Sequence, residues 1–289
     1  MRQLAHLALV LALLGGTIIL AQNGGPSSQD RTDPAPPSGS GSSSSGTASS
    51  ASAPEQQLFD LLNLEREKAG LNHLQWDERL ARAARKHSRL LASHRDLAHQ
   101  FPNEPAIAER LAAAGARFTV AAENVATAET SQVVHMALMA SPGHRANILD
   151  PRYNAAGVGV MERNGQLFVT QDFARTTRPY TEAEFREAFI AAFNRARAST
   201  GTIVIDAHAD SNLHSVACST QGSTPVLAAA GFNAAEVVTF TLSEPDKLPD
   251  QLMQYVRDAR LRRMGLGVCF RPSAKYGYAN FWVVAAFGE

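Results

Sequence analysis

Three things are scarce in this sequence: cysteine, aromatic side chains and an excess of either charge. Its 289 residues include two cysteines and 7% aromatic residues, and 27 basic residues balance 27 acidic ones. The balanced charge, with no basic stripe and no interleaving of basic and aromatic residues, excludes nucleic acid as an expected partner. Also missing are His-Glu-x-x-His, Gly-x-Ser-x-Gly and a glycine-rich phosphate loop, so no common catalytic motif indicates an enzyme.

The N-terminus has the pattern of a secretory signal. Arg2 precedes an apolar run from Leu7 to Leu20, and Ala21 follows the run. Its length of about 14 residues is below the roughly 20 that span a bilayer, so residues 1–21 are predicted to be a signal peptide. The alternative is an uncleaved anchor, the one route by which we expect a membrane contact. No cysteine follows the run, which excludes a lipid-modified cysteine there.

A tether follows the predicted signal. Residues 22–53 consist almost entirely of Gly, Ser, Pro, Ala, Thr, Asp and Gln. This composition cannot form a core and predicts a disordered linker. About 235 residues of ordinary composition remain, enough for one large or two modest domains. Signal and linker together predict a protein that is secreted or held in the periplasm or cell envelope.

The remaining chain predicts helices first and a hairpin afterwards. Apolar spacing and capping residues such as Asp77, Ser141 and Pro142 set the helix boundaries, and Asn164-Gly165 marks the hairpin turn. The sequence predicts helices at 54–70, 78–97, 106–113, from about 123 to 140 and from 141 to about 150, then strands at 157–160 and 166–173. This order favours an α+β or layered α/β/α domain.

The second half of the chain resembles the first. The matched pairs are Asn63 with Asn194, Arg66 with Arg197, Leu80 with Leu213, Ala84 with Ala217, Gly157–Val160 with Gly265–Val268, and Phe168–Phe173 with Trp282–Phe287. Such self-similarity predicts duplication of a whole domain, with domains at 54–177 and 178–289. The alternative is chance similarity in a chain rich in alanine and arginine.

The two cysteines, Cys218 and Cys269, both lie in the second half. An exported chain can oxidise them, and their even number allows one disulfide. The bridge would close a loop of about 50 residues and contribute on the order of 4 kcal/mol. The alternative is a pair of buried free thiols.

Three residues are candidates for chemistry. Glu123 follows small apolar residues, so its carboxylate is expected to be partly desolvated unless a cation compensates. His144, in the first turn of a predicted helix, is expected to be neutral. With His99, they form a ligand set of the kind found in open zinc sites. Glu123 as an ordinary helix-start carboxylate is the plainer alternative, and His87, His94 and His135 are interpreted as structural.

Residues 55–175 resemble a CAP domain, the superfamily of cysteine-rich secretory proteins, antigen 5 and plant pathogenesis-related proteins (also called the SCP domain), in its bacterial branch. The resemblance rests on Leu62-Asn63 with Arg66 and Gly70, Leu74 to Leu80 with Ala84, Glu123 to Ala126, Ser141 to Leu149, Gly157 to Val160, and Thr170 to Phe173. It implies an α-β-α sandwich with a central cleft.

The family cleft holds two histidines and two glutamates. By motif position, His99, Glu123 and His144 match three of the four, and the second glutamate has no clear counterpart. Ala122, Gln100 and Leu138 also depart from the usual pattern. Nothing in the second half matches the three residues, so 178–289 is expected to be a degenerate CAP-like domain without a site.

The resemblance implies an extracellular binding module. Its cleft would hold a divalent metal such as Zn²⁺, with His99, His144 and Glu123 as ligands, or a small apolar or lipid ligand; the partner would be an extracellular lipid, small molecule or protein. The alternative is a metal-dependent, peptidase-like hydrolase with Glu123 as general base. The absent fourth site residue and the lack of an obvious nucleophile oppose the hydrolase.

Overall fold

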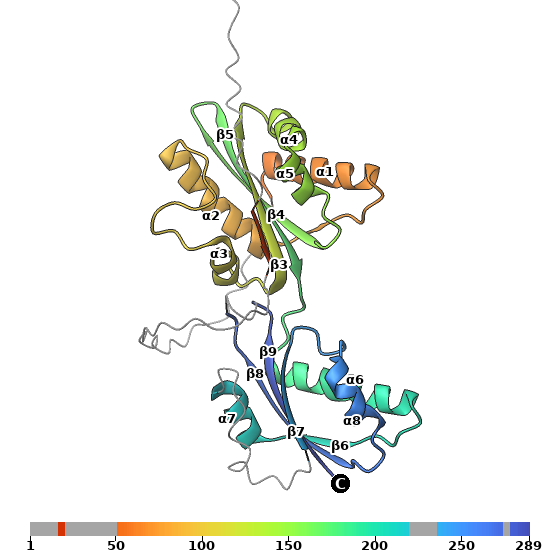
Figure 1. Ribbon diagram of the computed structural model, residues 1–289. Coiled ribbons are helices and arrows are strands. Elements are labelled where there is room, and N and C mark those ends of the chain that lie inside the picture. The colour runs from red at the N-terminus through yellow and green to blue at the C-terminus, as the bar shows by residue number, and fades with distance from the viewer. Residues whose placement is uncertain (1–16, 21–50, 220–235, 274–277) are drawn as a thin grey trace, which may run out of the picture.

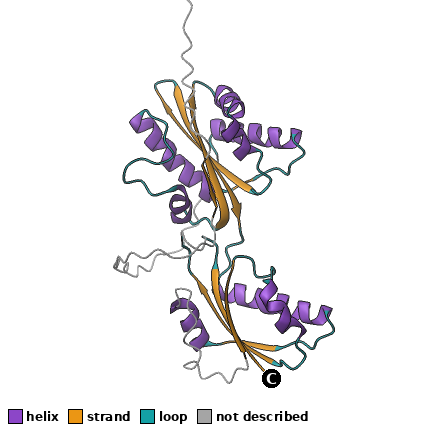
Figure 2. Ribbon diagram, in the orientation of Figure 1, coloured by secondary structure: helices purple, strands orange, loops and turns teal. Residues whose placement is uncertain are grey.

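The computed structural model describes residues 17–20, 51–219, 236–273 and 278–289. Two separate sheets follow one another along the chain, each covered by helices (Figures 1 and 2). Among the described residues, no helix has the length and apolar character needed to cross a bilayer.

The first half is an α-β-α sandwich, as expected. Its elements are α1 (Ala53–Lys68), β2 (Gln75–Trp76), α2 (Glu78–His94), α3 (Ile107–Ala113), β3 (Phe118–Ala128), α4 (Ser131–Ala140), α5 (Pro142–Ile148), β4 (Ala155–Arg163) and β5 (Gln166–Thr176). The sheet order is β1-β3-β5-β4-β2. Helices α2 and α3 cover one face, and α1, α4 and α5 cover the other (Figure 1).

The sheet's edge strand β1 (Thr17–Leu20) comes from the predicted signal peptide. It pairs antiparallel with β3, and Thr17 lies opposite Glu123. The rest of the predicted signal and nearly all of the linker, residues 1–16 and 21–50, lie outside the described residues. Both assignments therefore stay predictions.

The predicted helix beginning near Glu123 is wrong. Residues Phe118–Ala128 form strand β3, and the next helix begins at Ser131. The error has a physical reason: β3 pairs with β5 inside the sheet, and both Ala121 and Ala122 are fully buried. A strand buried on both faces lacks the alternation of apolar and polar residues that identifies strands, and alanine favours a helix intrinsically.

Helix α2 packs closely against β4 because β4 carries two glycines. A Cβ atom on Gly157 would lie 2.1 Å from the backbone nitrogen of Ala81, and one on Gly159 would lie 2.2 Å from that of Arg85. Only glycine allows a helix backbone to approach a strand so closely. This contact fixes α2, and with it the loop that carries His99, against the sheet.

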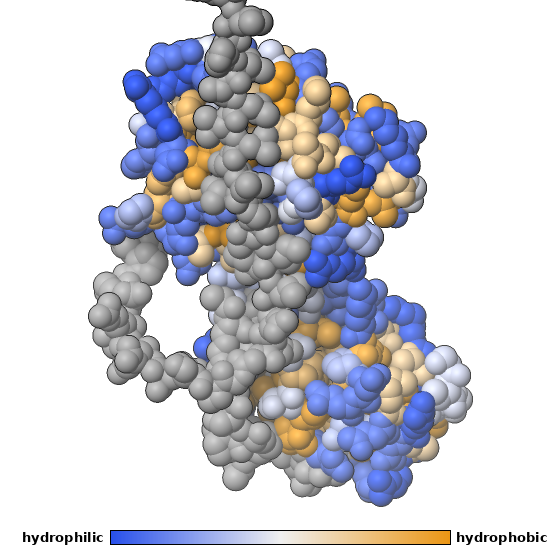
Figure 3. Space-filling model, turned by 45° about the horizontal axis from the view of Figure 1, so that its top comes forward, coloured by the Kyte–Doolittle hydropathy of each residue, from blue (hydrophilic) through white to orange (hydrophobic). Residues whose placement is uncertain are grey.

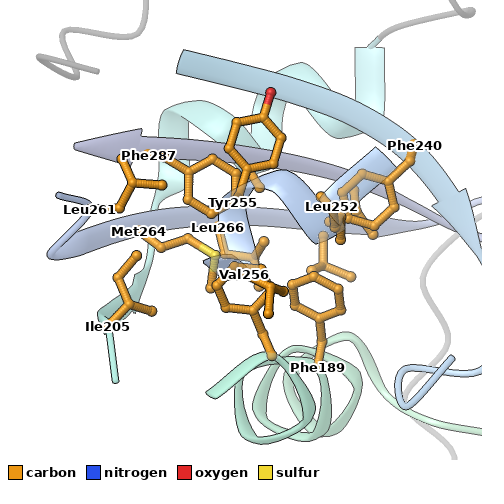
Figure 4. Packing of buried hydrophobic residues seen from close by; sticks show 14 of the residues in the cluster. Phe189, Ile205, Phe240, Leu252, Tyr255, Val256, Leu261, Met264, Leu266 and Phe287 are labelled. Atoms are coloured by element: carbon orange, nitrogen blue, oxygen red, sulfur yellow. The ribbon is translucent and has the colours of Figure 1, made fainter. Parts of the chain in front are cut away.

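The second half has its own sheet, ordered β6-β8-β9-β7. Its elements are α6 (Glu182–Ser199), β6 (Asp206–Ala209), α7 (Ser211–Ser219), β7 (Glu236–Leu242), the 3₁₀ helix η2 (Asp250–Leu252), α8 (Met253–Arg257), β8 (Arg263–Phe270) and β9 (Phe281–Gly288). Its core is an aromatic cluster that includes Phe189, Phe240, Tyr255 and Phe287 (Figure 4).

Side-chain contacts repeat between the halves. The amide of Asn63 bonds both backbone groups of Leu74, and that of Asn194 bonds both groups of Ile205, eleven residues ahead in each case.

The buried arginines repeat as well. Arg66 donates to the carbonyls of Asn72, Ile148 and Asp150. Arg197 likewise donates to backbone carbonyls, first to one six residues ahead, that of Ile203, and then to those of Tyr255, Asp258 and Leu261. The second half is therefore built on the plan of the first, while the boundaries 54–177 and 178–289 stay predictions.

The disulfide prediction is confirmed. Cys218 on α7 and Cys269 on β8 are bonded, with their Cα atoms 5.2 Å apart.

The two halves share an aromatic contact. Tyr278, from the second half, stacks on Phe118 with ring centroids 5.1 Å apart and joins the core cluster under α2 and α3. The guanidinium of Arg117 lies 3.8 Å from the ring centroid of Phe270. The second half thus completes part of the first half's core.

Candidate functional site

The three predicted site residues come from three different elements. Glu123 lies in β3, His144 in the first turn of α5, and His99 in the loop after α2. The motif asparagines join two of these elements. Asn124 donates to the carbonyl of His144 at 3.2 Å, and Asn147 donates to the side-chain oxygen of Asn124 at 2.9 Å. The two asparagines thus hold α5, which carries His144, against β3, which carries Glu123. We call His99, Glu123 and His144 together the histidine wall.

Glu123 is fully buried and both of its oxygens are engaged. Oε1 lies 3.0 Å from Nδ1 of His99, and Oε2 accepts a hydrogen bond from Arg110. Burial by itself raises the pKa of Glu123, but the His99 hydrogen bond and the charges of Arg110 and His87 outweigh it, so the pKa lies below its ordinary value. Arg110 is therefore the compensating cation that a desolvated Glu123 requires.

Arg110 connects the site to a second buried carboxylate. It lies 3.5 Å from Glu104, and it also donates to the carbonyl of His99 at 2.9 Å. Glu104 in turn lies 2.7 Å from Nδ1 of His87. One guanidinium thus holds both the carboxylate and the loop that orient His99.

The interpretation of His87 as a residue outside the site needs correction. Its side chain is fully buried, and Nε2 lies 2.8 Å from the carbonyl of Ala98 and 3.9 Å from Glu123. His87 lies one helix turn before Leu91 on the buried face of α2. From the sequence alone, a histidine at such a position is indistinguishable from a core residue.

Asp172 is a site residue that the sequence did not identify as such. It lies directly opposite Glu123 across the β3–β5 pair and is fully buried. Burial, followed by the charge of Glu123, raises its pKa well above the ordinary value, so the protonated form of this carboxyl group is favoured beside Glu123. Only the register of β3 against β5 reveals this neighbour.

Each site histidine has one buried nitrogen that no described residue hydrogen-bonds. Nε2 of His99 and Nε2 of His144 have no hydrogen-bond partner among the described residues. Burial, and then repulsion from His99, lowers the pKa of His144. The direction agrees with the one expected from the sequence, and burial is its largest cause.

These residues fit a metal ion in part. When Nδ1 of His99 donates to Glu123, Nε2 carries the lone pair, the arrangement by which carboxylates orient metal-binding histidines. However, the ligand atoms of His99, Glu123 and His144 do not all lie within 4.8 Å of one another. Within the described part of the chain, the one group of three or more whose ligand atoms all lie within 4.8 Å of one another is Glu182, Cys218 and Cys269. The candidate donors that remain are the two Nε2 atoms, with Glu123 bonded to Nδ1 of His99.

The first half is a layered α-β-α domain that carries the histidine wall. This combination indicates its class of protein. Residues 59–173 match the profile described as Cysteine-rich secretory protein family (CAP). The chain therefore carries a CAP domain, and the resemblance seen in the sequence is confirmed.

Three similar proteins each cover less than half of this chain. An uncharacterised protein of Bacillus subtilis, YkwD, is 36% identical over 121 residues, which are 42% of this chain and 47% of that protein. A solved extracellular protein with an SCP domain from Bacillus anthracis is 33% identical, with coverage of 42% and 40% and a TM-score of 0.39. An outer surface protein from Borrelia burgdorferi is 19% identical, with coverage of 43% and 93% and a TM-score of 0.41. The chain spans about half the length of YkwD.

Proposed function

We propose that this chain is an exported binding module whose CAP domain holds a divalent metal ion, such as Zn²⁺, between His99 and His144. The observation that carries the proposal is the pair of buried Nε2 atoms without a hydrogen-bond partner among the described residues. A buried neutral imidazole that finds no protein partner is suited to a metal. The location outside the cytoplasm rests on the predicted signal and on the extracellular and outer surface proteins that the chain resembles.

In this proposal Glu123 is a positioning residue. Its carboxylate accepts from Nδ1 of His99 and is held by Arg110, so it fixes the orientation of the imidazole and leaves coordination to the nitrogen atoms. Outer carboxylates of this kind contribute about 10- to 100-fold to metal affinity.

The hydrolase alternative has less support. A general base needs an oxygen within reach of a water molecule, and both oxygens of Glu123 already bond to His99 and Arg110. Loss of peptide or ester turnover in a Glu123→Gln variant would be required to restore this alternative.

A shallow cavity of about 590 Å³ lies on the outer side of α1, and none of its lining residues belongs to the histidine wall. Its lining consists of Ala53, Gln56, Gln57, Asp60, Leu61 and Leu64. In Figure 3 apolar patches on the visible face alternate with hydrophilic residues and form no broad apolar surface.

Calorimetric titration of the oxidised protein with zinc at pH 7.5 tests the proposal. His144→Ala should lower the affinity at least tenfold, because it removes one of two ligands. His73→Ala is the matched control, since His73 is a half-exposed histidine of the same half. Equal affinity in wild type and His144→Ala would contradict the metal site.

A further inference from the structure

A second cluster of metal-ligating residues surrounds the disulfide of the second half. Cys269 lies near the end of β8, Cys218 lies near the end of α7, and Glu182 is the first residue of α6. Their ligand atoms lie within 4.8 Å of one another. His214 adds a fourth group, with Nε2 3.6 Å from Sγ of Cys218.

His214 is oriented as a ligand. Its Nδ1 lies 2.7 Å from the carbonyl of Val268, which can only accept, so Nδ1 carries the proton and the Nε2 lone pair faces Cys218. A backbone carbonyl often fixes metal-binding histidines in this way. The spacing of His214 and Cys218, four residues apart on α7, places both side chains on one face of the helix.

Glu182 is held in place by the sheet. One of its oxygens, Oε1, accepts from the backbone nitrogen of Phe270 at 2.8 Å, and Oε2 lies 3.7 Å from Nδ1 of His214. The carboxylate is thus anchored at the end of β8, and one of its oxygens lies within 4.8 Å of both sulfurs.

We infer that this cluster becomes a zinc site when the disulfide is reduced. A dithiol, such as that of a thioredoxin-like protein outside the cytoplasm, transfers two electrons and two protons to Cys218 and Cys269 and is itself oxidised to a disulfide. Zn²⁺ then binds the two sulfurs as thiolates, releasing two protons, with His214 and Glu182 as the third and fourth ligands. Two thiolates, an imidazole and a carboxylate are all ligands that tetrahedral zinc accepts.

The cluster is accessible to both reagents. Cys218 is half-buried, and the side chains of His214 and Glu182 are 44% and 37% exposed. In a tetrahedral site the sulfurs would stand about 3.8 Å apart, given zinc–sulfur bonds of about 2.3 Å. A change in the rotamer of Cys218, in the last turn of α7, supplies this separation. The consequence is that α7 stays attached to β8 in either redox state, by a covalent bond or by a metal.

The test compares the full-length protein before and after reduction with a phosphine reductant. Cobalt is the probe, because thiolate ligands give a cobalt charge-transfer band in the near ultraviolet and histidine ligands do not. The band should appear only in reduced protein, and bound zinc should rise by one equivalent on reduction. A reduced protein that stays folded but shows neither change would overturn the inference.

Variants separate this site from the histidine wall of the first half. His214→Ala and Glu182→Gln should each weaken zinc binding by the reduced protein at least tenfold, while His208→Ala, an exposed histidine of the same half, should not. His144→Ala should leave the cobalt band unchanged, so failure of either site can be recognised separately. If reduction unfolds the second half, zinc should restore its thermal transition; a reduced protein that zinc does not rescue would also overturn the inference.

Discussion

The two halves place different residues at the same point of one scaffold. In the first sheet Gly157 of β4 lies opposite Asp172, and Asp172 lies opposite Glu123. In the second sheet Gly265 of β8 lies opposite Ala286, and Ala286 lies opposite Val237. Two carboxyl groups in one half thus correspond to two small apolar residues in the other.

The difference separates folding from function. Val237 and Ala286 pack beside Leu213 and Cys269 in an apolar cluster, so the scaffold does not need charges at this point. Buried ion pairs are often no more stabilising than hydrophobic residues of similar size. The network of Glu123, Arg110 and their neighbours is therefore not a requirement of the scaffold itself, which agrees with the binding role proposed above.

The largest effect is expected from Arg110→Ala. The change leaves Glu123 and Glu104 buried without their shared cation, and breaking a buried pair in this way destabilises by about 3–5 kcal/mol. Urea unfolding followed by circular dichroism measures it. Arg82→Ala is the control, because Arg82 is exposed and donates to a single carbonyl among the described residues, that of Ala114. Equal losses in the two variants would contradict the role of Arg110.

Separating the halves should have the next largest effect. A fragment of residues 51–177 contains every element of the first sandwich except β1, and we expect it to unfold cooperatively. It loses the Tyr278 ring that stacks on Phe118, so its stability should fall by about 2–3 kcal/mol, as for removal of a large core side chain. Tyr278→Ala in the full chain should shift the unfolding of the first half by a similar amount. A molten fragment would show that the halves fold as one unit.

Replacing the buried charged residues of the first half with apolar residues like those of the second half should have a smaller effect on stability. The triple variant Glu123→Val, Asp172→Ala, Arg110→Met removes Glu123 and Asp172 together with the guanidinium that bonds Glu123, while Glu104 keeps its contact with Nδ1 of His87. We expect it to lie within about 1.5 kcal/mol of wild type, and well above Arg110→Ala, while zinc affinity falls at least tenfold. A triple variant as unstable as Arg110→Ala would show that the network is required for folding.

How far the sequence predicted this molecule depends on the range of the interactions. Asn63, Arg66 and their counterparts were found because the same residue types recur at the same spacing in both halves. His99, Glu123 and His144 were found through resemblance to a family. Arg110 and Asp172 were missed because only the register of β3 against β5 and the packing of α3 bring them to Glu123. No local pattern encodes that register, and the alanines of β3 favoured a helix.

The smallest effect is expected in the pH dependence of stability, through the titration of His144. Because burial lowers its folded pKa below the unfolded value of about 6.5, the neutral ring contributes stability above pH 6.5, and this contribution is lost as the pH falls through the folded pKa. Wild type should therefore lose more stability between pH 7.5 and 5.5 than His144→Gln, whose side chain does not titrate. Nothing in the second half corresponds to His144, so the difference should appear only in the unfolding of the first half, measured by urea midpoints at both pH values in the absence of metal. Parallel losses in the two proteins would show that His144 does not titrate with folding, and would remove the argument that it is held neutral for a ligand.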